Sequence, residues 1–142
     1  MEIGAKEIIT QKRLLNLFSK KLGYTYLGDW TDRENNSNVE EMYLRKFLTD
    51  RKIYSPVEIN SAVNQLKRVA GNIHAGLYHA NKEVYNLLRY GINVSAEASE
   101  NKKQVHLIDW ANPFANDFYV AEEVTVKGRN TKRPDMVIYV NG

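Results

Sequence analysis

The chain has 142 residues, of which 43% are hydrophobic and 26% are charged, and its formal net charge is +3 at pH 7. This composition is typical of a soluble domain with a hydrophobic core, and no apolar run reaches the ~20 residues that span a bilayer. The absence of cysteine excludes disulfides, thiolate metal sites and a cysteine nucleophile. With no signal-peptide pattern either, we expect a cytoplasmic protein without a membrane partner.

Apolar residues at helical spacing predict the structure of the first third of the chain. A helix from about residue 8 carries a stripe through Leu15 and Leu22 and ends at Gly23, in the position where glycine closes helices. Residues 28–38 are polar and predict a loop. A second helix is expected over residues 39–48, opened by Glu40 and Glu41, whose carboxylates suit the positive end of the helix dipole. A metal-binding role for these two glutamates is the less favoured interpretation.

The third predicted helix has the clearest local signal. Ser55 and Glu58 form a capping box, with Pro56 at the first helical position, where its missing N–H costs nothing. An apolar face then runs to Ala70. A fourth helix is expected to end at Gly91.

After Gly91 the apolar residues change to the alternation of strands. Strands are predicted over residues 105–110, 118–126 and 136–140, with a polar turn over residues 127–133. A helical part over about 1–91 followed by a sheet part over about 92–142 predicts an α+β domain, although the pattern does not fix the strand order.

Pro134 and Asp135 open the final apolar strand and supply a candidate catalytic residue. Cleavage of a phosphodiester uses a hard cation to neutralise phosphate oxygens and activate water, and Mg²⁺ takes one or two carboxylates with waters and phosphate. An aspartate at a hairpin mouth could hold such an ion. The alternative is an ordinary turn aspartate beside a proline, and a lone Pro-Asp pair is a weak motif.

Several motifs in order resemble the N-terminal nuclease domain of the R subunit of type I restriction enzymes. The segment that matches the family most closely runs from Arg133-Pro134-Asp135 to Asn141-Gly142. The upstream matches are Leu22-Gly23-Tyr24, Tyr26-Leu27-Gly28, Leu87-Leu88-Arg89-Tyr90-Gly91, Leu107-Ile108-Asp109-Trp110, Asn112-Pro113, Asn116-Asp117-Phe118 and Val124-Thr125-Val126. The resemblance covers essentially the whole chain.

The resemblance implies a restriction-endonuclease-like fold over 1–142, with Asp135 as the catalytic metal ligand and Mg²⁺ as the cofactor. It implies cleavage of double-stranded DNA by a type I site-specific deoxyribonuclease, in complex with modification and specificity subunits. ATP binding and translocation belong to helicase motor domains of the parent protein, and this chain has no phosphate-binding loop for ATP.

The family's Glu-x-Lys strand does not follow Asp135, so the fold is expected to be incomplete. The chain is then either a fragment of a longer R subunit or a natural truncation that has lost catalysis. The continuation of R subunits into motor domains favours the fragment, and the chain alone is expected to be inactive. We also expect the cut sheet to expose an edge after Val140 that promotes association.

Charged residues near Asp135 have alternative interpretations. The polar turn contains a basic cluster formed by Lys127, Arg129, Lys132 and Arg133. This basic turn could bind DNA phosphates without reading the base sequence, or it could be a solvated hairpin turn, and the two interpretations are weighed equally. Glu122 and Glu123 alternate in direction, and one of them could approach Asp135 across the hairpin and share a cation. The family more often has a glutamine near Glu123, so the resemblance transfers no catalytic role to it.

Two other classes of function remain open. The helices over residues 39–48 and 56–70 could form a non-catalytic docking module that anchors an R subunit to its partners or to its own motor. A general DNA-binding domain is the weaker alternative, and it would bind DNA with a steep salt dependence in the absence of a divalent metal.

Overall fold

The computed structural model describes residues 3–95 and 102–142. It confirms the α+β prediction, with four α-helices and five strands in the part that it describes. The described residues form two compact units. Unit 1 comes from Met1–Glu40, Asp117–Val140 and Gly142, and unit 2 comes from Glu41–Asn116 and Asn141. No helix among the described residues is both long enough and apolar enough to cross a bilayer.

Unit 1 begins with helix α1 (Ile3–Asn16), which continues as a π-helical turn, η1 (Leu17–Lys21). As predicted, the helix closes at Gly23, which has φ +74°, a left-handed conformation that glycine adopts without a steric penalty. Two aromatic contacts follow, because Tyr24 packs against Phe18 with ring centroids 5.2 Å apart and stacks on Phe118 at 5.0 Å. These contacts pack the end of the helical segment against the sheet.

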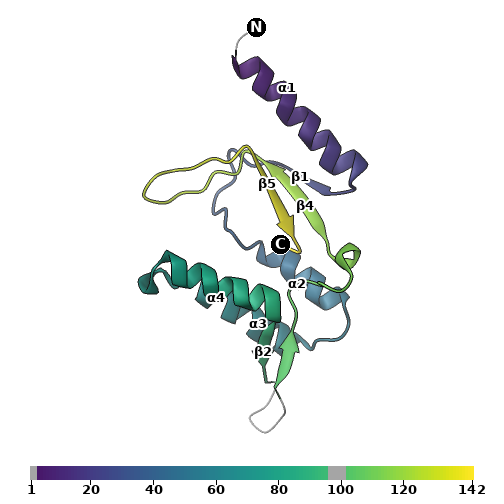
Figure 1. Ribbon diagram of the computed structural model, residues 1–142, viewed down its shortest axis with the longest axis vertical. Coiled ribbons are helices and arrows are strands. Elements are labelled where there is room, and N and C mark those ends of the chain that lie inside the picture. The colour runs from purple at the N-terminus through teal and green to yellow at the C-terminus, as the bar shows by residue number, and fades with distance from the viewer. Residues whose placement is uncertain (1–2, 96–101) are drawn as a thin grey trace. The chain divides into compact units, whose positions relative to one another are not determined.

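A three-stranded sheet forms the rest of unit 1, with β4 (Phe118–Glu122) between β1 (Thr25–Asp29) and β5 (Met136–Val140), as Figure 1 shows. β1 runs parallel to β4, and β5 runs antiparallel to it. Val120 and Ala121 of β4 are fully buried, so the central strand supplies the core of the sheet.

Unit 2 contains α2 (Glu41–Asp50), α3 (Pro56–Ala70) and α4 (Leu77–Tyr90), with α3 packed against both of the others. The short helical turns η2 (Ile73–Ala75) and η3 (Pro113–Ala115) lie in its loops. The capping box is confirmed, because Ser55 Oγ accepts the Glu58 N–H and the Glu58 carboxylate accepts the Ser55 N–H. The fully or nearly fully buried core side chains are Leu44, Phe47, Leu48, Ile59, Ala62, Val63, Leu66, Ile92, Val94, Val105 and Leu107.

Strand β1 lies inside the part of the chain for which only helices and a loop were predicted, so that prediction is wrong at this strand. Its tyrosine and threonine favour a strand, but Gly28 and the polar residues that follow favour a turn. The decisive interaction is parallel pairing with β4, about ninety residues further along the chain, in which Thr25 is opposite Tyr119. Local periodicity cannot reveal a pairing at that distance.

The strand predicted over residues 105–110 is also wrong beyond Val105. The structure has β3 (Lys103–Val105), paired antiparallel with β2 (Ile92–Val94), a strand that was not predicted. The extended stretch stops at Val105, and residues 107 and 108 lie in bends. Further along, the Asp109 carboxylate accepts the backbone N–H of Asn112 at 2.8 Å, which favours a turn. An apolar run was therefore mistaken for a longer strand.

The strand predicted over residues 118–126 ends at Glu122, since Glu123 has φ +51° and leaves the extended conformation. Beyond it, only an isolated bridge joins Val126 to Lys132. The predicted polar turn and the final strand are confirmed, and residues 127–133 belong to the long loop between β4 and β5 in Figure 1.

Candidate functional site

Strand register brings acidic residues to one end of the sheet of unit 1. Asp29 at the end of β1 is opposite Glu122 at the end of β4, and Glu122 is opposite Met136 at the start of β5. Asp135 immediately precedes Met136. Because β1 is parallel and β5 antiparallel to β4, all of these chain positions meet at the same sheet end.

Asp135 is held at the mouth of this hairpin by its backbone. Its carbonyl oxygen accepts the N–H of Glu123 at 3.0 Å, and the carbonyl oxygen of Pro134 accepts the N–H of Val124 at 3.1 Å. The Asp135 side chain is exposed, and its carboxylate makes no hydrogen bond or ion pair with another described residue. The backbone of Asp135 is therefore held in place by hydrogen bonds, while its carboxylate is accessible to solvent and available to a ligand.

Glu123, and not Glu122, lies opposite Asp135 across the hairpin. One carboxylate oxygen of Glu123 forms an ion pair with Arg133 Nε at 2.9 Å, and the other accepts from Gln11 Nε2 at 3.2 Å. The same Gln11 nitrogen donates to the Asp135 carbonyl oxygen at 3.3 Å. Helix α1 thus supplies a side chain that contacts both acidic residues of the hairpin.

The other two carboxylates at this sheet end have separate hydrogen-bond partners. Glu122 Oε2 accepts the Tyr26 hydroxyl at 3.1 Å, and burial together with this hydrogen bond raises the pKa of Tyr26. Asp29 Oδ1 accepts from the hydroxyl of Thr31 at 2.6 Å and from its N–H at 2.9 Å. These bonds lower the pKa of Asp29, and the charge of Arg133 lowers it further.

The ligand requirements of Mg²⁺ can be compared with the carboxylates at this end of the sheet. Among the residues that the structure describes, no three histidine, cysteine or acidic side chains form a group that could hold a metal ion. Mg²⁺ commonly takes only one or two protein carboxylates and completes its shell with water and phosphate. Asp135 alone, or Asp135 with Glu123, matches that smaller donor set in chemistry.

The predicted basic turn divides into two parts. The side chains of Lys127, Arg129 and Lys132 are exposed on the loop between β4 and β5, with the backbone of Lys132 bonded to Val126. Arg133 instead lies beside Glu123 in an ion pair. Three cationic side chains of the turn therefore face solvent, while Arg133 neutralises the Glu123 carboxylate. Phosphate binding by this turn stays a prediction.

The glutamates before and at the start of α2 are held by structural ion pairs. Arg33 binds the nearly buried Glu40 with two 2.9 Å contacts and lies 3.8 Å above the Trp30 ring. Glu41, in the first turn of α2, contacts Lys67 at 2.7 Å and Arg45 at 2.9 Å, and these two partners lower its pKa. Such pairs account for both glutamates without a metal.

Several motif residues on either side of Asp135 in the sequence form a hydrogen-bond cluster in unit 2. The fully buried Asn141 donates through Nδ2 to Leu107 O and to Asn116 Oδ1, both at 2.9 Å. Asn116 Nδ2 donates to Asp109 O and Pro113 O, and Asn116 Oδ1 accepts the Asp109 N–H. These residues satisfy buried polar groups, so their pattern in the sequence reflects structure rather than catalysis.

Sequence reasoning missed Gln11, Tyr26 and Asp29 as neighbours of the hairpin. Gln11 carries no signal of its own, because a polar residue on the exposed side of a predicted helix is ordinary. Tyr26 and Asp29 were missed because β1 was missed. The aromatic and β-branched residues from Tyr24 to Tyr26 were the available indication of a strand.

One comparison with known proteins gives a match. The family model described as "Type I restriction enzyme R protein N terminus" matches residues 5–142, essentially the whole chain. Neither a curated protein nor a solved structure gives a significant match.

Proposed function

We propose that this chain, which belongs to the family of type I restriction enzyme R protein N-termini, contributes part of a metal-dependent nuclease centre that cuts double-stranded DNA. The observation that carries the proposal is the exposed Asp135 carboxylate at the hairpin mouth, directly opposite Glu123. Turn aspartates are common, but this one is joined to a second acidic residue and to helix α1 through Gln11.

In this proposal Asp135 would hold Mg²⁺, and Glu123, opposite it across the hairpin, would be the second donor. The bound ion would neutralise phosphate oxygens and lower the pKa of an attacking water. Gln11 is a positioning residue, since it donates to the Glu123 carboxylate and to the Asp135 carbonyl oxygen. Arg133 balances the charge of Glu123 while no phosphate is present.

The exposed basic turn would contact DNA phosphates that flank the cut. Lys127, Arg129 and Lys132 carry no sequence information in that role, because contacts to phosphate position a protein on DNA without reading bases. This agrees with a complex in which a specificity subunit reads the target. ATP-driven translocation and binding of the modification subunit are proposed for the parent enzyme by family membership.

Plasmid nicking tests the proposal. The assay uses this chain and any longer product of its gene, each unaltered and as an Asp135→Asn variant, with Mg²⁺ or Mn²⁺. The longer product is also assayed with the modification and specificity subunits and ATP. We expect cutting that needs the metal and is lost in Asp135→Asn, with unchanged circular dichroism. Asp50→Asn, at the end of α2, is the matched control and should cut normally.

Cutting that persists in Asp135→Asn would contradict the proposed role of Asp135. If no form cuts even with the subunits and ATP, a docking module becomes the better function. The apolar faces of α2 and α3 do not favour that alternative, because Phe47, Ile59 and Val63 are already buried within unit 2.

A further inference from the structure

The outward face of α4 carries two aromatic and two cationic side chains in alternation. Tyr78, Lys82, Tyr85 and Arg89 follow one another at intervals of four, three and four residues, which places them on one face of a helix. The helix buries the opposite face, through Ala80, and the four side chains are exposed, Tyr78 to 75% and Tyr85 to 60%. At 1.5 Å per residue this α4 stripe is about 16 Å long.

A fixed aromatic ring extends the α4 stripe at its C-terminal end. The indole N–H of Trp110 donates to the Leu88 carbonyl oxygen at 2.9 Å, while 51% of the residue remains exposed. The Arg89 guanidinium lies 5.3 Å from the Trp110 ring and 6.0 Å from the Tyr90 ring. A guanidinium held over aromatic rings keeps its in-plane N–H donors directed outward, where they can bind a phosphate.

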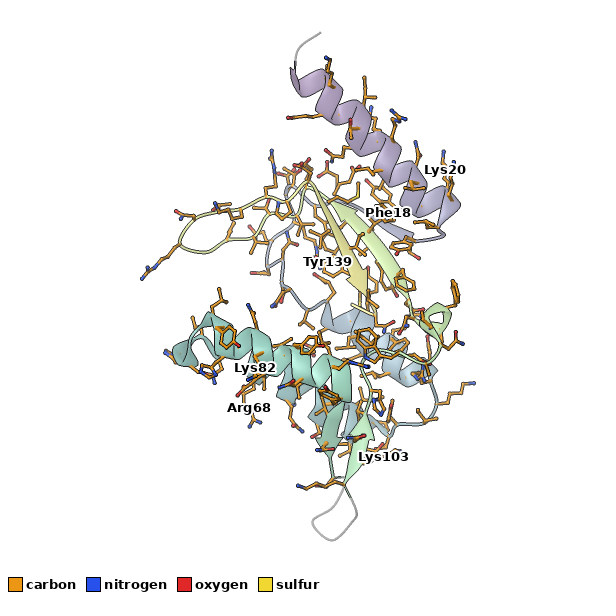
Figure 2. The ribbon with its side chains drawn as sticks, viewed as in Figure 1. Phe18, Lys20, Arg68, Lys82, Lys103 and Tyr139 are labelled. Atoms are coloured by element: carbon orange, nitrogen blue, oxygen red, sulfur yellow. The ribbon has the colours of Figure 1, made fainter. Side chains whose placement is uncertain are left out.

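The charge of this surface favours an anion. Within the described residues, Lys82 and Arg89 make no hydrogen bond or ion pair, so their charges are not neutralised by a neighbour. Glu83 is the one acidic residue of α4, and its position next to Lys82 turns it about 100° away from the stripe. Figure 2 labels a further exposed cation, Arg68, on the neighbouring helix α3.

We propose that the α4 stripe and Trp110 bind a single DNA strand, with bases stacked on the aromatic rings and phosphates held by Lys82 and Arg89. Aromatic platforms interleaved with cations are what single-strand binding requires, since every base has a face that can stack and every nucleotide has a charge. A base-paired duplex keeps its bases stacked on one another and can use only the cations. The inference rests on the proposed function for the choice of DNA as partner, but it concerns a different surface.

Fluorescence anisotropy with a labelled oligothymidine, compared with a duplex of equal length, tests the proposal without divalent metal. The variants are Tyr78→Leu with Tyr85→Leu, which keeps helix-forming apolar side chains, and Lys82→Gln with Arg89→Gln. We expect the tyrosine pair to weaken single-strand binding about tenfold or more, because stacking contributes about 1–3 kcal/mol per base. Duplex binding should change less than twofold.

The cation pair gives a second, independent measurement. The affinity of the Lys82→Gln, Arg89→Gln variant for single-stranded DNA should depend less on salt. The slope of log affinity against log salt concentration should be smaller by about 0.7 for each phosphate that the variant no longer binds. Phe114→Leu, an exposed aromatic residue outside α4, and Lys102→Gln are the matched controls, and both should bind as the unaltered chain does. Quenching of Trp110 fluorescence by the oligothymidine should accompany binding.

Equal weakening of single-strand and duplex binding by the tyrosine pair would overturn stacking, and unchanged binding in both variants would overturn the site. An unaltered chain that does not bind oligothymidine would also overturn it. These outcomes are separable from the nuclease proposal, because Asp135→Asn should abolish cutting and leave the single-strand affinity unchanged. A protein that competes with oligothymidine for the α4 stripe without binding DNA itself would point to a protein partner instead.

Discussion

Glu123 and Asp135 face each other across the β4–β5 hairpin, with the N–H of Glu123 donating to the carbonyl oxygen of Asp135 at 3.0 Å. This pairing places the residue after β4 beside the residue before β5, although eleven residues separate them. Glu123 adopts a φ of +51° there, which is uncommon for a residue other than glycine. Gln11 and Arg133 hold its carboxylate. The candidate centre is therefore a pair of acids whose separation is set by backbone pairing.

Gln11 is expected to control how well this pair accepts a metal. Gln11→Leu removes the donor to Glu123 and to the Asp135 carbonyl oxygen while keeping a side chain of similar size. Residues that orient a metal-binding carboxylate typically contribute about 10–100-fold to metal affinity, so Mn²⁺ affinity should fall by about tenfold or more. Electron paramagnetic resonance measures this affinity directly. Asn16→Leu, an exposed position on the same helix, should bind Mn²⁺ normally; an unchanged affinity in Gln11→Leu would remove the positioning role.

Asn141 should contribute to stability through two separable effects. It is fully buried, has φ +61°, and donates to Leu107 and Asn116. Asn141→Gly keeps the backbone conformation but removes both hydrogen bonds, and leaving a buried acceptor unpaired costs about 1–3 kcal/mol. Asn141→Ala adds the strain of a left-handed conformation. In urea unfolding, the free energy of unfolding should be highest for the unaltered chain, lower for Asn141→Gly and lowest for Asn141→Ala. Equal stability of the two variants would show that the strain is absent.

Ser55 should stabilise α3 as the first residue of its capping box. Ser55→Ala removes the oxygen that accepts the Glu58 N–H and should cost about 1 kcal/mol. Ser55→Asp keeps an acceptor at the same place and is the control. A domain of this size loses about 2–4 °C in Tm for each kcal/mol, so calorimetry can resolve the difference. Equal Tm values for Ser55→Ala and the unaltered chain would mean that water replaces the cap without loss.

Glu58 should make the chain less stable in acid. The backbone N–H of Ser55 lowers the pKa of Glu58, and Lys103 lowers it further. A depressed pKa in the folded state gives stability that is fully present above the unfolded pKa of about 4.3, and this stability is lost as pH falls through the folded pKa. Glu58→Gln keeps the oxygen acceptor but cannot titrate. Between about pH 5 and pH 3 its Tm should therefore fall less than that of the unaltered chain; parallel Tm curves would contradict this origin of the acid sensitivity.

The helices could be predicted from the sequence because their signals are local. The capping box of α3 lies within four residues, from Ser55 to Glu58, and the helix end at Gly23 needs only one residue in a left-handed conformation. β5 could be predicted for the same reason, since its alternating apolar residues follow directly after a polar turn. Asp135 was identified as a candidate site residue from its position before this strand and from the family resemblance.

Short strands and the surroundings of Asp135 could not be predicted in this way. β1 depends on pairing with β4, far along the chain, and β2 and β3 are only three residues each, too short to show a period. The missed neighbours of the hairpin are Gln11 of α1 and Tyr26 and Asp29 of β1, and nothing in their sequence spacing connects them to Asp135. The residues of the α4 stripe stand at helical spacing in the sequence, but that spacing does not show which face of the helix is buried.

Local sequence patterns were sufficient to predict the four helices, the bounds of α3, the final strand, the α+β class and the family. These depend on contacts between residues a few positions apart, or on a pattern that can be compared directly. The bounds of two helices differ from those expected, because α1 begins at Ile3 rather than near residue 8 and α2 spans Glu41–Asp50 rather than residues 39–48. The folded structure was needed to show that β1 joins the sheet and that Glu123 rather than Glu122 faces Asp135. It was also needed to show that Gln11 contacts both Glu123 and Asp135. Strand pairing and side-chain hydrogen bonds between distant segments depend on the free energy of the whole fold, which no local pattern records.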